Sequence, residues 1–309
     1  MAASATTKRT FADEDGPYHL PNDTPEHERL DAQHRAFAEV MGGKIFHAPT
    51  SKLFFPNAPS RPRKILDIGC GTGVFTVQLG RLFPDAQVLG VDLSPVPTSR
   101  HGQLPNVTYL TGAPIADLLA RGALQRGSFD YVFSRLVLLG IVGWPAHLRD
   151  VVMALLAPGG CAELHEYDAM IRSARAGGAE LGGDWAWFRL WMEDTLAMGL
   201  DMRIGAHFKQ LLLDAGADDV VENVYDIPHA GPPSAQQQGG AANNEDYWTT
   251  VVETYWSVVA KNAEGRRSAA ELKEMRESFD KTFVANLRDL MCRMHVVVAH
   301  KPENQSDNY

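Results

Sequence analysis

A glycine-rich run, Asp67-Ile68-Gly69-Cys70-Gly71-Thr72-Gly73, is the segment whose residue types most directly suggest chemistry. Glycines carry no Cβ, so the backbone of such a turn can approach a nucleotide-like ligand, and a helix that follows it offers free N–H groups. The run departs from the dinucleotide fingerprint, because Val74 stands where glycine or alanine is required, and it lacks the Gly-Lys-Ser/Thr of a phosphate loop. It therefore predicts a binding turn of a kind separate from NAD sites and phosphate loops.

Asp92 is the second feature with chemical meaning, and it ends the apolar run over residues 87–91. A carboxylate at the tip of a strand can accept two hydrogen bonds from ribose hydroxyls. A glycine loop alone is weak, but a strand, a glycine turn, a helix, a strand and an acid in this order indicate nucleoside binding much more strongly. The alternative is a tight turn with a capping aspartate.

Alternating strands and helices must position these residues. Short apolar runs predict seven strands, over residues 64–68, 87–91, 107–110, 129–133, 161–166, 220–227 and 295–299. Helical spacing predicts helices within 18–40 and over 74–83, 147–156 and 206–215, with two more between 241 and 290. Strands that alternate with helices indicate parallel crossovers. The expected fold class is α/β, a doubly wound and mostly parallel seven-stranded sheet with added helices.

The added helices are expected to form a cap on a single domain. We expect a disordered tail over 1–17, one domain over 18–300 and a flexible tail over 301–309. Within the domain, the expected parts are N-terminal cap helices over 18–60, a binding core over 61–168, and cap insertions over 169–203 and 241–290.

Charge and cysteine content narrow the functional class. The 309 residues carry a net charge of -9 and show no basic stripe, which argues against a nucleic-acid partner. No stretch reads as a signal peptide or as a membrane span of about 20 apolar residues. Cys70, Cys161 and Cys292 lie far apart in apolar runs and no Cys/His cluster has zinc spacing. We expect buried reduced thiols, no metal site, no membrane partner and a cytoplasmic location.

On these residues the chain resembles the class I S-adenosylmethionine-dependent methyltransferases. The resemblance is carried by residues 64–95, 127–135 and the turn Pro158-Gly159-Gly160. More narrowly, the chain is similar to the fungal LaeA-like methyltransferases of secondary metabolism, through Tyr18-His19-Leu20-Pro21-Asn22-Asp23, Gly143-Trp144-Pro145 and Glu163-Leu164-His165-Glu166. The resemblance implies a Rossmann-like methyltransferase fold, S-adenosylmethionine as methyl donor and a small-molecule acceptor.

The resemblance also implies roles for residues around the donor. The glycine loop would line its methionine and ribose parts, and Asp67 would orient that loop or reach the ammonium group through water. Asp92 would hold the ribose hydroxyls. The full set is Tyr18, Asp67, Gly69, Gly71, Gly73, Asp92, Leu93, Ala113, Ser134 and Arg135.

The adenine end departs from the family pattern. Many relatives place an aspartate after the third strand, where this chain has Ala113. Adenine would then pack on Leu93 and depend on backbone groups near Ala113 and Ile115, or on Asp117. At the other end, Ser134 and Arg135 would border the methionine group and Tyr18 would close the pocket.

Residues after the fifth strand are the candidates for contact with the acceptor. Methyl transfer is an in-line displacement that needs the acceptor atom held about 3 Å from the methyl carbon, and a phenol also gains from a base. Ligands of open α/β sheets sit outside the carboxyl ends of the strands, which makes His165 and Glu166 candidate catalytic groups and Asp168 a candidate substrate contact. Adjacent strand residues point to opposite faces, so one of His165 and Glu166 would face the pocket. A structural role for either is equally open.

Aromatic residues of the cap supply further candidates. Trp187 and Trp191 are expected to contact a flat or cationic substrate, with packing onto the sheet as the alternative. The helical stripe that includes Tyr247, Trp248, Tyr255 and Trp256 is interpreted as cap core, and His207, His229 and His295 as structural histidines.

Three functions remain open at this point. The favoured one is methyl transfer to an oxygen, nitrogen or sulfur atom of a small molecule. The second is a regulatory LaeA-like protein that acts in a complex. The third is a donor-binding enzyme with a reaction other than methyl transfer. The acceptor atom, the need for a base and the oligomeric state cannot be read from the sequence.

Overall fold

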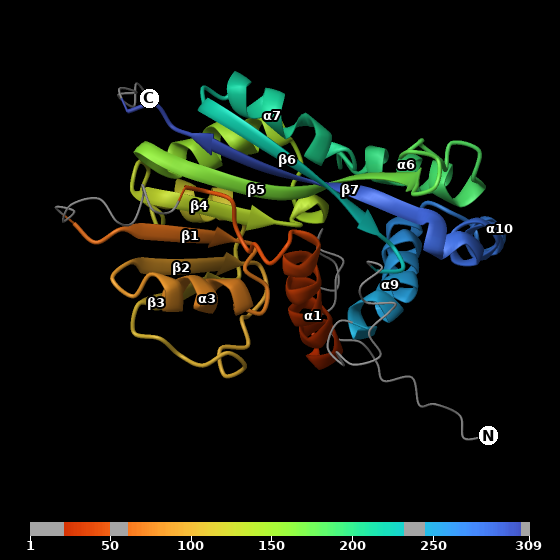
Figure 1. Cartoon of the computed structure of the whole chain (residues 1–309), viewed down its shortest axis with the longest axis horizontal. Coiled ribbons are helices and arrows are strands. Elements are labelled where there is room, and N and C mark those ends of the chain that lie inside the picture. Colours follow the sequence, from red (N-terminus) through yellow and green to blue (C-terminus); the bar gives the residue numbers. More distant parts are fainter. Residues whose placement is uncertain (1–21, 50–60, 232–244, 304–309) are drawn as a thin grey trace.

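The computed structural model describes residues 22–49, 61–231 and 245–303, which form one seven-stranded sheet with helices on both faces (Figure 1). The strand order is β3-β2-β1-β4-β5-β7-β6. Neighbouring strands are parallel except that β7 is antiparallel to both β5 and β6. The predicted fold class is therefore confirmed. The strands are β1 (Lys64–Ile68), β2 (Gln87–Asp92), β3 (Val107–Thr111), β4 (Phe129–Arg135), β5 (Leu156–Ser173), β6 (Asp218–Pro228) and β7 (Leu290–His300).

Helix α1 begins where a capping residue satisfies a free N–H group of its first turn. Asp23 accepts a hydrogen bond from the backbone N of Glu26 at 3.0 Å, and Pro25 lies in the first turn of α1. The described helices are α1 (Thr24–Val40), α3 (Val74–Leu82), α4 (Ile115–Ala120), α5 (Trp144–His147), α6 (Ala186–Ala197), α7 (Ile204–Asp214), α9 (Glu245–Ala263) and α10 (Ala269–Thr282), with short turns η1 (Leu138–Gly140), η2 (Leu148–Met153) and η3 (Val284–Asp289). In the described ranges, every helix falls short of the length and apolar character needed to cross a bilayer.

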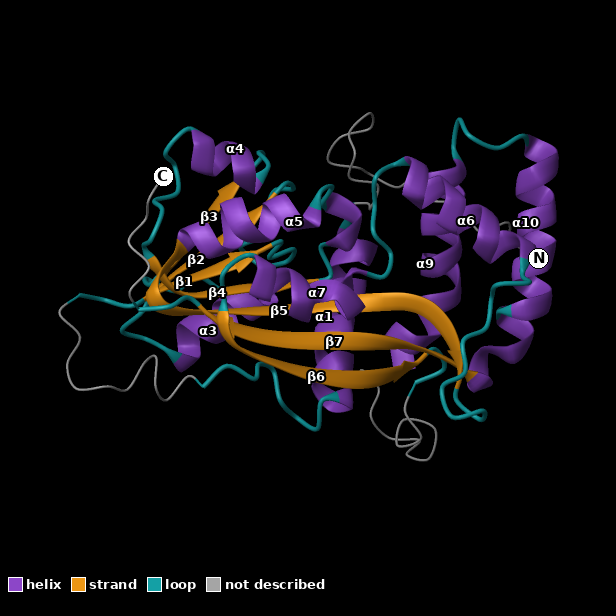
Figure 2. Ribbon diagram, turned by 90° about the horizontal axis from the view of Figure 1, so that it is seen from above, coloured by secondary structure: helices purple, strands orange, loops and turns teal. Residues whose placement is uncertain are grey.

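Two apolar clusters hold these helices against opposite faces of the sheet. Figure 2 shows α4, α5 and α7 on one side and α3 on the other. Strand alternation supplies both clusters: Val132 of β4 packs into the first and the next residue, Phe133, into the second. Burial on both faces is typical of a parallel sheet and accounts for the nearly continuous apolar runs of the central strands.

The pair β5–β7 extends beyond the parallel core and carries the cap. Its pairing runs from Cys161 opposite His300 to Ser173 opposite Leu290, with an irregular register between Asp168 and Arg172. Helices α6, α9 and α10 gather beside the far end of this pair (Figures 1 and 2). The cap and the central sheet thus share two continuous strands.

Two predicted elements differ from the structure. The helix expected over 147–156 is the single turn α5 followed by the π-helical turn η2. The fifth strand was expected over 161–166 but is 18 residues long, because β7 pairs with it well past that range. The expected turn at Pro158 lies inside β5, where the register with β4 shifts between Phe129 and Tyr131.

Candidate functional site

A cavity of about 480 Å³ opens where the glycine-rich run leaves the sheet. This volume lies within the range of about 300–1,000 Å³ that is usual for small-molecule sites. One end is lined by the segments that follow β1, β2 and β3, and the other end reaches α6, α9 and the end of β6. We call these the donor end and the acceptor end.

Glycine geometry shapes the donor end. Gly69 and Gly71 both line the cavity and have φ values of 69° and 55°, in the left-handed region that favours glycine. A Cβ on Gly69 would clash with Cγ1 of Val137, so a larger residue would have to displace that side chain. Gly73 has φ 78° but packs against Tyr109 and is not part of the cavity wall.

Asp92 lies beside this loop and lines the cavity. Its carboxylate accepts hydrogen bonds from the backbone N of Gly71 and of Ser94, each at 2.8 Å. Two such bonds leave acceptor capacity on both oxygens, since a carboxylate has about four lone-pair sites. Burial raises the pKa of Asp92, although these backbone bonds oppose the shift. The carboxylate is thus aimed by the loop and still able to accept hydroxyl donors.

An apolar wall continues from Asp92. Leu93, Ala113 and Ile115 line the cavity, whereas Asp117 is exposed on α4 outside it. Of the two alternatives for adenine recognition, the structure places the backbone near Ala113 and Ile115 at the cavity, and leaves Asp117 away from it.

Two charged side chains face each other at the inner part of the donor end. Asp67 is buried and accepts a hydrogen bond from the Thr76 hydroxyl at 2.6 Å, and burial raises its pKa to about 7. Arg135 donates to Nδ1 of His34 at 2.7 Å and lies over the Phe75 ring. Its Nη1 is shielded from solvent and has no hydrogen-bond partner in the described parts of the chain. A guanidinium N–H is therefore available to an acceptor in the cavity.

Ser134, a further residue expected at the donor, does not line the cavity. Ser134 is buried on β4 between Ile68 and Leu164 and is absent from the cavity wall, because strand alternation turns it away from the face that carries Arg135. Tyr18 lies outside the described residues.

His165 and Glu166 face opposite sides of the sheet, as the alternation predicts, but neither side chain lines the cavity. Oε1 of Glu166 accepts a hydrogen bond from the backbone N of Val137 at 2.5 Å, and burial raises the pKa of Glu166 to about 8. This carboxyl group anchors the segment after β4. The structure places Glu166 away from the cavity wall, with Oε1 turned to a backbone N–H and Oε2 without a partner among the described residues.

His165 belongs to a separate cluster around Glu163. Nε2 of His165 lies 2.7 Å from Oε1 of Glu163, which also accepts hydrogen bonds from the backbone of His47 and Ala48 and from the Tyr131 hydroxyl. Burial alone would raise the pKa of Glu163, but the hydrogen bonds from His165 and His47 outweigh it and lower this pKa to about 2. The expectation of a catalytic His165 is corrected on the same ground of position.

The Glu163 cluster has the side-chain composition of a metal site. Ligand atoms of His47, Glu163 and His165 lie within 4.8 Å of one another. The carboxylate oxygens are already engaged by backbone and hydroxyl donors, and they tie the segment 47–48 to the sheet. The hydrogen bonding accounts for the cluster as an anchor.

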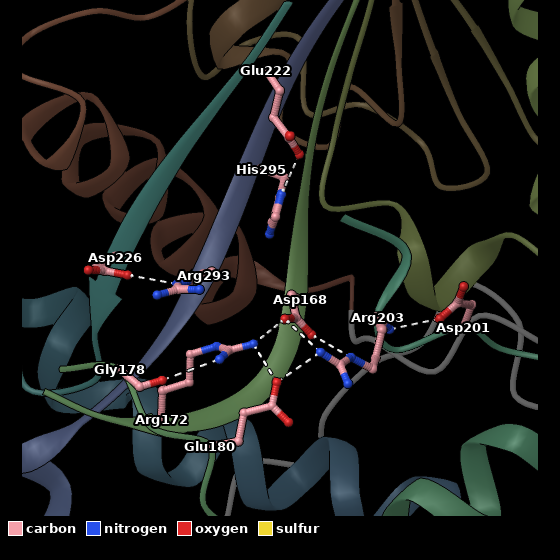
Figure 3. Close-up of polar contacts among 10 residues, drawn as sticks. All are labelled: Asp168, Arg172, Gly178, Glu180, Asp201, Arg203, Glu222, Asp226, Arg293 and His295. Carbon is pink, nitrogen blue, oxygen red and sulfur yellow. Dashed lines mark hydrogen bonds and ion pairs between the residues drawn. The ribbon is translucent and has the colours of Figure 1, made fainter. Parts of the chain in front are cut away.

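Asp168 lies in an ion-pair network instead of the cavity (Figure 3). Its carboxylate contacts Arg172 at 2.7 Å and Arg203 at 3.0 Å, and Glu180 bridges the same two guanidinium groups. The network sits at the irregular register between β5 and β7. The expected substrate contact at Asp168 is corrected to a role in holding this bend.

Of the two cap tryptophans, only Trp191 reaches the cavity. Trp187 is fully buried among Phe279, Phe283 and Tyr255, and its Nε1 donates to the Thr282 hydroxyl at 2.9 Å. The expectation for Trp187 is therefore corrected to cap core.

Several residues of the acceptor end were interpreted from the sequence as structural. Tyr247, Trp248 and Tyr255 pack in the cap and line the cavity as well, and so does His229. Helical spacing marked the apolar face of α9 but could not indicate that this face borders a hollow. His229 carried no local signal, since it follows β6 alone among apolar and turn residues.

The chain matches a known protein family and named relatives. Residues 34–221 match the family described as "Methyltransferase domain". The chain is 33% identical over 152 residues to "Methyltransferase str2" of Strobilurus tenacellus, which covers 49% of this chain and 50% of that protein. It is 34% identical over 155 residues to "Secondary metabolism regulator laeA" of Aspergillus flavus, covering 50% and 38%. The matched region thus spans half or less of these two curated relatives.

Solved structures include a more distant similarity. A phosphoethanolamine N-methyltransferase of Haemonchus contortus, in complex with S-adenosylhomocysteine, is 18% identical with a TM-score of 0.45, over 88% of this chain and 58% of that one. The fold assignment rests on the strand order of the chain itself.

Proposed function

Because the chain belongs to the class I S-adenosylmethionine-dependent methyltransferases, we propose that it transfers a methyl group to an oxygen, nitrogen or sulfur atom of a small molecule, of the kind made in fungal secondary metabolism. The observation that carries the proposal is one cavity that joins a nucleoside-binding end to an aromatic end. Both reactants would meet inside it, shielded from bulk water.

The donor end fits S-adenosylmethionine on its own chemistry. The shielded and unpartnered Nη1 of Arg135 suits a carboxylate, such as that of the methionine group. Asp67 suits an ammonium group, which would lower its raised pKa. Asp92 suits ribose hydroxyls, and the wall of Leu93 and Ala113 suits a flat base. When bound, S-adenosylmethionine supplies an electrophilic methyl group on a positively charged sulfur.

The residues of this chain bind the acceptor, orient it and remove its hydration shell. His147 and His229 are the histidines of the described cavity wall, and burial lowers their pKa values to about 4 and about 3. Both are neutral near pH 7, so each can accept a hydrogen bond but is a poor base. The proposed mechanism therefore relies on a nucleophile whose lone pair is already available. Positioning of that nucleophile supplies most of the rate enhancement of such a displacement.

A second candidate function comes from the relatives. One is named as a regulator of secondary metabolism and another as the "Protein-methionine methyltransferase laeA" of Emericella nidulans, 33% identical over 153 residues. A protein substrate or a protein complex is the alternative to a small molecule. A stable protein partner, retained through size-exclusion chromatography, would favour this alternative.

The decisive experiment follows the methyl group. The purified chain is titrated with S-adenosylmethionine by calorimetry and then incubated with it and a panel of neutral phenols, amines and thiols. We expect binding, and formation of S-adenosylhomocysteine together with a product heavier by one methylene unit. If the donor binds and an acceptor reacts without gaining this mass, the enzyme catalyses a reaction other than methyl transfer. If S-adenosylmethionine does not bind, the proposal is wrong.

A further inference from the structure

The acceptor end of the cavity is a chamber with aromatic walls from distant parts of the chain. We define this aromatic chamber by Tyr167, Trp191, His229, Tyr247, Trp248 and Tyr255, all of which line the cavity. They come from β5, α6, the end of β6 and α9. Aromatic walls of this kind favour a flat and largely apolar occupant.

Most of the charge on the described cavity wall lies at the opposite end. The Asp, Glu, Lys and Arg side chains placed on that wall, in the parts of the chain whose side chains the structure describes, are Arg29, Asp67, Asp92 and Arg135. All four belong to α1 or to the segments around the glycine loop. Arg29 is close enough to Tyr167 and Tyr247 to influence both hydroxyls, but it is already paired with Glu26 at 2.6 Å. An anionic occupant of the aromatic chamber would therefore lose its hydration for a cation that already has a carboxylate partner.

Three polar atoms in the chamber lack the hydrogen bonds that buried groups normally make. Nε2 of His229 and the indole Nε1 atoms of Trp191 and Trp248 are shielded from solvent and have no partner in the described structure. The three residues are 5%, 3% and 6% exposed. Trp187, in the neighbouring cap core, has its Nε1 satisfied by Thr282. All three atoms belong to residues of the cavity wall, so each has a hydrogen bond to offer to an occupant.

His229 is held rigidly in place. Its backbone N donates to the carbonyl of Leu290 at 2.9 Å, and its ring packs against the Tyr255 and Phe283 rings at centroid distances of 5.9 and 5.0 Å. Apolar surroundings keep the imidazole neutral, and a neutral imidazole has one nitrogen that accepts a hydrogen bond and one that donates. The indole groups of Trp191 and Trp248 can only donate.

We propose that the aromatic chamber binds an uncharged, flat and largely apolar acceptor, and that it selects a hydroxyl or carbonyl group on that acceptor through His229, Trp191 and Trp248. A hydroxyl is matched best, because it donates to an imidazole nitrogen and accepts from an indole N–H. This inference rests on the proposed function, since it names the acceptor class for the same cavity.

The experiment measures two kinds of binding to each variant of the full chain by calorimetry. S-Adenosylhomocysteine reports on the donor end. 2-Naphthol and its anionic counterpart 2-naphthoate, each added with S-adenosylhomocysteine present, report on the chamber. The variants are His229→Phe and Trp191→Phe, which remove the polar atoms but keep an aromatic ring, and His207→Phe, the matched change at an exposed histidine on α7.

We expect the unsubstituted chain to bind 2-naphthol at least about tenfold more tightly than 2-naphthoate, because Arg29, the cation coupled to Tyr167 and Tyr247, is already paired with Glu26. His229→Phe should weaken 2-naphthol binding about tenfold, as for a lost buried hydrogen bond, while S-adenosylhomocysteine binding stays within about twofold. His207→Phe should change neither. Thermal unfolding of each variant shows whether it is folded.

The outcomes separate the two proposals. Bound S-adenosylhomocysteine with no 2-naphthol binding, equal affinity for the two naphthalenes, or a folded His229→Phe variant with unchanged 2-naphthol affinity would each overturn the chamber inference. Binding of 2-naphthol with the expected preference but no binding of S-adenosylhomocysteine would instead overturn the proposed function and support the chamber.

Discussion

The guanidinium of Arg135 donates to Nδ1 of His34 at 2.7 Å, which joins β4 to α1 at the wall of the cavity. Nε2 of the same imidazole lies 2.8 Å from the side-chain oxygen of Gln78. Burial and the neighbouring Arg135 lower the pKa of His34 to about 3, so the ring is neutral, accepts from the arginine and donates to the glutamine. His34 is therefore a positioning residue for the group proposed to hold the donor carboxylate.

We expect His34→Leu to weaken S-adenosylhomocysteine binding about tenfold, because the guanidinium loses a charge-assisted hydrogen bond and with it a fixed orientation. Arg135→Leu should weaken binding further, since it removes the carboxylate partner itself. Calorimetry measures both. His27→Leu, on the same helix but away from the cavity wall, serves as the control and should be unchanged. Equal affinities for all three variants would show that Arg135 does not contact the ligand.

We expect Asp92 to contribute to donor affinity through the ribose, and Asp117 to make no contribution through the adenine. Asp92→Ala removes two possible hydroxyl contacts and frees the N–H groups of Gly71 and Ser94, so the dissociation constant of S-adenosylmethionine should rise by at least about a hundredfold. Asp117→Ala should leave it within about twofold, because that carboxylate lies outside the cavity. A marked loss in the second variant would mean that α4 takes part in adenine recognition.

Glu166 is expected to act as an anchor, and conservative replacement tests this. Glu166→Gln keeps an oxygen for the Val137 N–H, so donor affinity should change little, and stability should change little near pH 4.5, where the buried carboxyl group is neutral like the amide. Glu166→Ala leaves that N–H unsatisfied and should cost about 1–3 kcal/mol of unfolding free energy. Urea unfolding measures the difference. If the glutamine variant instead retained stability and donor binding but lost turnover, Glu166 would be part of the chemistry.

The raised pKa of Glu166 also predicts a pH dependence of stability. Its ordinary pKa of 4.5 describes the unfolded chain, whereas burial raises it to about 8 in the folded protein. Between these values the folded state keeps a proton that the unfolded state has released, so this group lowers the unfolding free energy as pH rises, by at most about 1.4 kcal/mol per unit. The melting temperature of Glu166→Gln should fall less steeply across this window than that of the unsubstituted chain. Parallel curves would contradict the assignment.

Asp168 should support stability without affecting donor binding. Removing Asp168 takes away the buried carboxylate that Arg172 and Arg203 share. Because Arg203 and Glu180 are partly exposed, Asp168→Ala should lower the unfolding free energy by about 1.5–3 kcal/mol. Asp226→Ala breaks the pair with Arg293 on the neighbouring strand, in which Asp226 is 55% and Arg293 35% exposed, and should cost less than about 1 kcal/mol (Figure 3). Unfolding in urea gives both values. A cost for Asp168→Ala as small as that of the control would show that the bend in β5 does not need this network.

Local patterns were enough to predict the donor end. The strand before Asp67, the glycine spacing and the strand that ends at Asp92 each lie within a few residues of chain, and their order identifies the turn they build. Gly73 was the exception within the run, because its contact is Tyr109 on another strand. The sheet could be predicted for the same reason, since short apolar runs bounded by turn residues mark each strand.

The acceptor end could not be predicted because its contacts join distant segments. Strand alternation correctly placed His165 and Glu166 on opposite faces of the sheet. The hydrogen-bond partner of Glu166 is the backbone N–H of Val137, and no pattern near residue 166 predicts that contact. Trp187 and Trp191 are the same residue type on the same helix, yet of these two only Trp191 lines the cavity. Such outcomes depend on how α6 meets α9, which is a matter of tertiary packing.

The two ends of the cavity are built from different stretches of the chain, and this has a consequence for how the protein can evolve. Most of the residues proposed to hold the donor lie between Asp67 and Arg135, while His229, Tyr247, Trp248 and Tyr255 all follow residue 226, beyond the segment matched by the family. A single genetic crossover near that residue would exchange most of the acceptor wall and leave the glycine loop, Asp92 and Arg135 untouched. Recombination at this point could therefore change the acceptor specificity of the protein without changing the residues proposed to bind the methyl donor.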